Sequence, residues 1–157
     1  MRRVSPVELP AKRSSVSSGP VVVLVTDDPA VGFSALRELH GVGYEVKPVR
    51  LRLRASDDVR KGRALIRERA ELVVIDASQH PSLALALLEA LRATDGTVPV
   101  IVIAGDDDGA RDEAERLGAE AVLEASLDVS RLRAAAEALV PVLRELDVDE
   151  VRGYSFH

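Results

Sequence analysis

Short uninterrupted apolar runs recur along this chain, and each is followed by a segment with helical periodicity. Strands that are buried on both faces have this composition, because neither face carries alternating polar residues. The pattern is typical of a parallel sheet covered by helices on both sides. The predicted strands cover 21–25, 44–53, 72–75, 98–103 and 121–123, and the predicted helices cover 30–40, 56–70, 81–93, 109–117 and 129–146, the last bent or split at Pro141. We therefore expect an α/β fold with a doubly wound, five-stranded parallel sheet in three layers.

The length and the composition fit one domain with a segment on either side. The chain has 157 residues, which is enough to build a single core. Residues 1–19 are rich in Ser and Pro and have no apolar period, so we expect a disordered N-terminal arm there. We expect the folded domain to cover 20–147 and a C-terminal tail to cover 148–157.

Several classes of protein are disfavoured by what the sequence lacks. It contains no cysteine, no signal-peptide pattern at the N-terminus and no apolar run of membrane-spanning length, which predicts a cytoplasmic protein with no membrane contact. The formal net charge is −5 although the N-terminal arm is basic, so the folded body is acidic. An acidic body argues against direct nucleic-acid binding. Arg far outnumbers Lys, which is typical of a GC-rich bacterial gene.

Acidic residues follow two separate predicted strands. Asp27 and Asp28 come after the first strand, and Asp76 comes at the end of the third. The carboxyl ends of parallel strands meet at one edge of the sheet, so these carboxylates are expected to converge there. Converging carboxylates repel one another unless a cation neutralises them, and Mg²⁺ prefers oxygen ligands. The ordinary alternative is that an Asp after a strand caps the next helix.

Five stretches of sequence coincide with the predicted strands and the turns beside them. They are Val21-Val-Val-Leu-Val-Thr-Asp-Asp-Pro, His40-Gly-Val-Gly-Tyr-Glu-Val, Glu71-Leu-Val-Val-Ile-Asp, Val98-Pro-Val-Ile-Val-Ile-Ala and Gly118-Ala-Glu-Ala-Val-Leu-Glu-Ala-Ser-Leu. Together they resemble a two-component response-regulator receiver domain, from about Val21 to Leu146. The resemblance implies a flavodoxin-like topology. It also implies that Asp27 and Asp28 hold Mg²⁺ together with Asp76, and that Asp76 accepts a phosphoryl group from a histidine kinase.

The same resemblance shows where this chain departs from the family pattern. Ala104 stands at the end of the fourth strand, where the family has a Ser or Thr that contacts the phosphoryl group. Ala125-Ser126 stands where the family has a Lys-Pro pair, and Val122 where it often has an aromatic switch residue. Phosphoryl transfer relies on positive charge and donors around the phosphoryl oxygens, so these changes remove stabilisation of the transition state.

We therefore expect an atypical, stand-alone pseudo-receiver that is not an enzyme. In this interpretation it binds a protein partner, or a second copy of itself as a homodimer, without a phosphorylation switch. The alternative is a working Mg²⁺-dependent phosphoacceptor, phosphorylated on Asp76 by a histidine kinase in a phosphorelay. A third hypothesis is a doubly wound domain that binds a cationic small molecule in the acidic pocket.

Two further segments are candidates for partner binding. Arg50, Arg52 and Arg54 alternate with leucines, so on a strand they share one face, which suits an acidic partner or simply protects an edge strand. Tyr154 and Phe156 place two of the four aromatic residues in the C-terminal tail. That tail either docks on a partner or a neighbouring subunit, folds back onto its own domain or frays.

Overall fold

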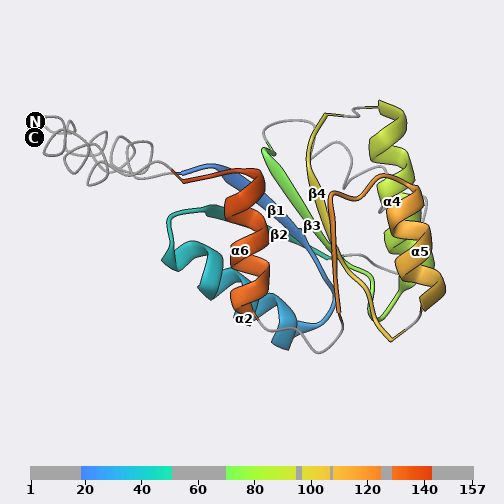
Figure 1. The fold of residues 1–157 in the computed structure, drawn as a ribbon. Helices are drawn as coiled ribbons and strands as arrows, with labels where there is room; N and C mark the ends of the chain where they lie inside the picture. Colours follow the sequence, from blue (N-terminus) through green and yellow to red (C-terminus); the bar gives the residue numbers. More distant parts are fainter. Residues whose placement is uncertain (1–18, 51–69, 95–96, 107, 125–128, 143–157) are drawn as a thin grey trace, which may run out of the picture.

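The structure is a computed structural model that describes residues 19–50, 70–94, 97–106, 108–124 and 129–142. Within these ranges a parallel sheet has the strand order β2-β1-β3-β4-β5, with helices on both faces (Figure 1). This confirms the predicted α/β fold class and the flavodoxin-like strand order. The elements are β1 (Val21–Val25), α2 (Pro29–Gly41), β2 (Glu45–Val49), β3 (Leu72–Asp76), α4 (Pro81–Thr94), β4 (Val100–Ile103), α5 (Asp108–Arg116), β5 (Ala121–Leu123) and α6 (Val129–Leu139).

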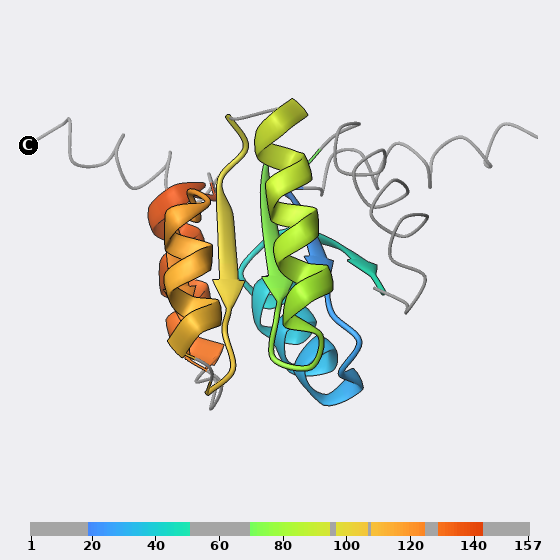
Figure 2. The ribbon, with the colours of Figure 1, turned by 90° about the vertical axis from the view of Figure 1, so that its right-hand side faces the viewer.

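The sheet separates two apolar clusters, one on each face. Successive strand residues point to opposite faces, so Val22 and Leu24 of β1 join one cluster while Val23 and Val25 join the other. The first cluster packs against α2 and α6, and the second packs against α4 and α5. Figures 1 and 2 show these helix pairs on opposite sides of the sheet. Because β1, β3 and β4 are buried on both faces, their sequences are continuous apolar runs.

Helix α2 begins and ends at residues with strong local preferences. Asp28 caps the helix and Pro29 occupies its first position, where a proline loses no helical hydrogen bond. After the helix ends, Gly43 has a φ of +115°, a conformation that glycine adopts without strain. The amide of Tyr44 then donates to the carbonyl of Leu39 at 3.1 Å, so the chain turns directly into β2. The turn after α2 thus returns the chain to the sheet, where β2 pairs with β1. At the other end of the helix, Asp27 and Asp28 follow directly after β1.

The final predicted helix, 129–146, ends before Pro141 in the structure, and its residues 143–146 lie outside the described ranges. Helix α6 ends at Leu139, two residues before Pro141. A proline disfavours helical backbone in the residue before it, which accounts for this end. Among the described residues, none of the helices is both long enough and apolar enough to cross a bilayer.

Several predictions fall outside the described residues. They concern most of the arm 1–19, the helix 56–70 and the tail 148–157, and the individual residues Arg52, Arg54, Ala125, Tyr154 and Phe156.

Candidate functional site at the carboxyl edge of the sheet

The ends of β1, β3 and β4 bring their following loops together. Val25 pairs with Ile75 in the parallel register, so Thr26 and Asp76 come next to each other at the carboxyl edge. On the other side of β3, the amide of Ala77 donates to the carbonyl of Ile103 at 2.8 Å. The two hydrogen-bonded neighbours hold the end of β3 in the centre of the sheet, where Asp76 is 5% exposed.

Asp76 is surrounded by donors from its own chain. Its Oδ2 accepts a hydrogen bond of 2.6 Å from the Thr26 hydroxyl. Its Oδ1 accepts one of 2.6 Å from the Ser78 hydroxyl and one of 3.0 Å from the Ser78 amide. Hydrogen bonds to a carboxylate are among the stronger ones in proteins, and they compensate for its burial. Both oxygens of the predicted phosphoacceptor are therefore engaged within the chain.

Thr26 connects Asp76 to the start of the loop after β1. Its side chain is buried, and its Oγ1 accepts a hydrogen bond of 3.0 Å from the Asp28 amide while donating to Asp76. Its own amide donates to the carbonyl of Val49 at 3.0 Å, which extends the pairing of β1 with β2. Thr26 is thus held in place by backbone contacts and presents its hydroxyl to Asp76.

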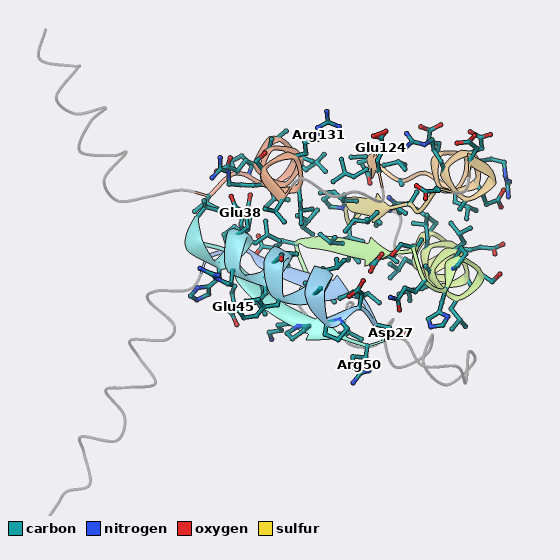
Figure 3. All side chains as sticks on the ribbon, turned by 90° about the horizontal axis from the view of Figure 1, so that it is seen from below. Asp27, Glu38, Glu45, Arg50, Glu124 and Arg131 are labelled. Atoms are coloured by element: carbon teal, nitrogen blue, oxygen red, sulfur yellow. The ribbon has the colours of Figure 1, made fainter. Side chains whose placement is uncertain are left out.

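Asp27 has one buried carboxylate oxygen without a hydrogen-bond partner. Its side chain is 14% exposed, and its Oδ2 lies 3.7 Å from Nε2 of His80. Its Oδ1 is buried and has no hydrogen-bond partner. A buried carboxylate oxygen without a partner is costly, so this position favours a cation or a hydrogen-bond donor. Figure 3 shows Asp27 at the edge of the sheet, beyond the end of β1.

Asp28 has a different role from the one that the resemblance implies. Its Oδ1 accepts hydrogen bonds from the amides of Ala30 at 2.9 Å and Val31 at 3.5 Å. These are the interactions of a helix N-cap, which was the ordinary alternative for an acid after a strand. Asp27 and Asp28 are therefore neighbours in sequence but do not act here as a pair.

The described residues do not fit a magnesium site made of three carboxylates. Within those residues, no three acidic or histidine side chains are grouped as a metal ion requires. Both oxygens of Asp76 already accept hydrogen bonds, and the Asp28 side chain caps α2. Asp27 alone among the predicted ligands retains a buried oxygen with no partner. The role of Asp27, Asp28 and Asp76 as a Mg²⁺ site stays a prediction.

The positions of the family's switch residues carry no polar side chain where the structure describes them. Ala104 is fully buried, and its amide donates to the carbonyl of Leu123 at 2.8 Å. Val122 is partly buried and packs against the cluster that includes α4. The next residue after Ala104 is Gly105, and a Cβ atom on it would lie 3.4 Å from the Cα of Ser78. Ser78 therefore lies against the exit of β4, so a hydroxyl reaches Asp76 from the β3 loop rather than from β4.

Three residues of this site were not predicted from the sequence, namely Thr26, Ser78 and His80. Ser78 carries a recognisable signal, because an Asp commonly accepts hydrogen bonds from the residue two positions later. The Asp28-Pro29 step is likewise a recognisable N-cap signal. Thr26 carries no local signal, since its contact with Asp76 depends on the register of β1 with β3. Of the three arginines predicted to share one face of a strand, the structure describes Arg50, which is exposed directly after β2.

Comparison with solved structures identifies the fold. No model of a protein family matches the sequence, and neither does any curated protein. A CheY-like response regulator receiver domain from Methanospirillum hungatei superposes with a TM-score of 0.64 at 21% identity, over 77% of this chain and 93% of that chain. A receiver protein from Pseudomonas putida gives 0.64 at 20% identity, over 76% and 96%. One from Burkholderia phymatum gives 0.62 at 27% identity, over 80% and 98%.

This chain therefore has the fold of response regulator receiver domains. That is the fold of the signalling modules of two-component systems, and it agrees with the resemblance found in the sequence.

Proposed function

We propose that this chain is a pseudo-receiver: a signalling module that binds a protein partner and is not switched by phosphorylation of Asp76. The observation that carries the proposal is the hydroxyl clasp, which we define as the hydrogen bonds from Thr26 and Ser78 to both oxygens of Asp76. The clasp satisfies the carboxylate without a metal ion or a lysine ammonium. In this proposal the protein acts in the cytoplasm and turns over no metabolite.

The chemistry of phosphoryl transfer supports this interpretation. An attacking carboxylate must expose an oxygen to the phosphorus atom, and the developing charge must meet fixed positive groups or donors. Asp76 is almost completely buried and each of its oxygens accepts a hydrogen bond, while Ala104 offers no hydroxyl to a phosphoryl group. A switch also needs contacts that differ between its two states. The methyl groups of Ala104 and Val122 cannot hydrogen-bond to a phosphoryl group.

The proposal is tested by incubating the full chain with Mg²⁺ and acetyl phosphate, followed by intact mass measurement. We expect no phosphate adduct on the wild-type protein. Ser78→Ala is the informative variant, because it removes one donor of the hydroxyl clasp from Oδ1 of Asp76. Asp76→Asn is the negative control for any adduct. An adduct on the wild type that disappears in Asp76→Asn would overturn the proposal.

Partner binding gives a second, independent test. Once a partner has been identified, its affinity for the wild type and for Asp76→Asn is expected to be the same, because the signal does not pass through an acyl phosphate. A matched control is Asp106→Asn, an exposed acid beyond the end of β4. A partner that binds only after treatment with acetyl phosphate would contradict the proposal.

The second candidate function is a working phosphoacceptor supplied by a histidine kinase. One observation favours it: the unpartnered Oδ1 of Asp27, which a cation would satisfy. In this candidate the Thr26 and Ser78 hydroxyls rotate away and a carboxylate oxygen of Asp76 attacks the phosphorus atom of the kinase phosphohistidine. The P–N bond breaks, and the kinase histidine leaves as a free imidazole. A Mg²⁺ titration followed by amide chemical shifts discriminates the two functions. Saturable shifts at Asp27 and Asp76 that are lost in Asp27→Asn would favour the phosphoacceptor.

A further inference from the structure

A groove lies on the face of the molecule that carries α2 and α6, between the middle of α2 and the first residue of α6. It has a volume of about 340 Å³ and is lined by Phe33, Ser34, Arg37, Glu38 and Val129. Phe33 is 63% exposed and is the large hydrophobic side chain that the described part of the chain leaves open to solvent. An exposed aromatic ring in a groove is a common anchor for a partner segment.

The lining of this groove carries one guanidinium group, that of Arg37. The guanidinium of Arg37 lies 5.6 Å from the centre of the Phe33 ring, so a positive charge lies over one face of the ring. Glu38 is neutralised by Arg133, whose Nη1 lies 3.0 Å from its Oε2. Figure 3 shows Glu38 on α2, on the side that faces α6. An occupant that suits the groove therefore combines aromatic side chains with negative charge.

We propose that the groove binds the C-terminal tail of the same chain, residues 143–157. The tail contains four acids followed by two aromatic residues, namely Glu145, Asp147, Asp149, Glu150, Tyr154 and Phe156. Its acids complement Arg37, and its aromatic side chains complement the exposed ring of Phe33. Aromatic pairs of this kind are favourable beyond the apolar area that they bury. This inference goes beyond the proposed function and does not depend on it, because the groove is formed by other residues than the clasp around Asp76.

The length of the tail is sufficient for this contact. Helix α6 has 11 residues and is about 16 Å long, so the described chain ends roughly that far from the groove. The 12 residues from 143 to 154 span up to about 40 Å when extended. A tethered segment that can reach its site has an effective concentration in the millimolar range. That tether favours the chain's own tail over a segment of equal chemistry on a separate molecule.

The absence of cysteine from the sequence makes a direct test straightforward. In the full chain, Ser155→Cys is introduced and coupled to a nitroxide spin label, and amide signals are compared before and after reduction of the label. We expect signal loss at Phe33 and Arg37 on α2, and none at Glu113 on α5, which lies on the other face of the sheet. Equal loss on both faces, or no loss on α2, would overturn the proposal.

Two variants test whether the groove itself holds the tail. Phe33→Ala and Arg37→Glu each change an exposed side chain, so the fold is expected to persist, which the dispersion of the amide signals checks. Both are expected to restore the signals of α2, and added salt is expected to restore them partly. Arg116→Glu on α5 is the matched control and is expected to leave the effect unchanged. Signal loss on α2 that survives both groove variants would contradict the assignment to this groove.

A mixing experiment separates the chain's own tail from that of a second copy. Isotope-labelled protein without the spin label is mixed with spin-labelled protein without the isotope. We expect no loss of signal on α2 in this mixture. Loss that appears in the mixture would show that the tail of a second copy occupies the groove, and would overturn the proposal. Neither result depends on phosphorylation, so failure here is distinct from failure of the proposed function.

Discussion

At the scale of single residues, the site is defined by how Asp76 is satisfied. A carboxylate at the centre of the sheet edge is costly to bury, and here three donors offset that cost. Two of the donors are hydroxyl groups, which form good hydrogen bonds without adding a positive charge. The site therefore keeps its acid, while Ala104 and Val122 stand where receiver domains have a Ser or Thr and often an aromatic residue.

Thr26 is expected to contribute measurably to the stability of the fold. Thr26→Val keeps the shape of the side chain but removes the donor to Oδ2 of Asp76 and the acceptor for the Asp28 amide. We expect the free energy of unfolding to fall by about 1–3 kcal/mol, as for other buried polar groups that lose a partner. Urea unfolding at neutral pH measures this change. Thr26→Ser retains the hydroxyl and is the control; an equal loss in both variants would point to packing rather than hydrogen bonding.

Tyr44 gives a prediction about pH. Its buried hydroxyl donates to the carbonyl of Val140 at 2.6 Å, joining the start of β2 to the residue after α6. Burial raises the pKa of Tyr44 above its usual value of 10.0, and the negative charge of Glu137 raises the pKa further. The folded state therefore favours the neutral phenol, and its stabilising effect is complete below pH 10.0 and lost as the pH rises through the folded-state pKa.

The matching variant is Tyr44→Phe. At neutral pH it is expected to lower the free energy of unfolding by about 1 kcal/mol, because the Val140 carbonyl loses its donor. Above pH 10.0 the wild type is expected to lose stability more steeply than this variant. Unfolding curves at a series of alkaline pH values measure both effects. Parallel curves for the two proteins would show that Tyr44 does not titrate differently in the folded state.

At the scale of elements, α2 owes its position to the cap at Asp28. Asp28→Ala removes the acceptor for the amides of Ala30 and Val31, and we expect a loss of about 1 kcal/mol in the free energy of unfolding. Asp28→Asn keeps a capping oxygen and is expected to retain most of the stability. Thermal unfolding of the two variants measures the difference. If Asp28→Asn is as destabilising as Asp28→Ala, the negative charge matters more than the cap.

Arg92 connects three elements on the other side of the sheet. From α4 it donates to the carbonyls of Val98 and Gly118 and to Oε1 of Glu120, each at 2.8 Å. Glu120 in turn accepts from the amide of Val100 at 2.7 Å. The turn before β4 and the turn before β5 are thus held by one side chain that is largely buried.

Arg92→Ala is expected to lower the free energy of unfolding by about 1.5–3 kcal/mol, the range for hydrogen bonds to charged groups. Arg116→Ala on α5 is the control. Its partner Glu113 lies on the same helix and both are solvent-exposed, so no measurable change is expected. Urea unfolding of both variants tests this difference. Similar losses would mean that Arg92 contributes no more than a surface ion pair.

At the scale of the whole molecule, the fold could be predicted and the details of the site could not. Burial of β1, β3 and β4 on both faces leaves continuous apolar runs in the sequence, which is why the parallel sheet and its layers were predicted correctly. The strand order followed from the resemblance to receiver domains. The site depends on contacts between distant residues. From the sequence, Asp28 suits either a metal ligand or a helix cap, and its hydrogen bonds with the Ala30 and Val31 amides become visible only in the structure.

Thr26 is a second residue whose role could not be predicted from the sequence. It is an ordinary β-branched residue at the end of an apolar run, and its partner Asp76 is 50 residues away in sequence. The contact follows from the pairing of Val25 with Ile75, which sets Thr26 beside Asp76. Sequence patterns predict which residues lie in a strand, but they do not predict the register that brings two polar side chains together.

The central claim is that this receiver fold does not switch at Asp76. The most direct measurement compares amide chemical shifts of the full chain with Mg²⁺ alone and with Mg²⁺ plus beryllofluoride, an analogue of a phosphoryl group on a carboxylate. We predict that the signals of Ala104, Val122 and the strands β4 and β5 are the same under both conditions. Shifts at these residues that require beryllofluoride and vanish in Asp76→Asn would contradict the account.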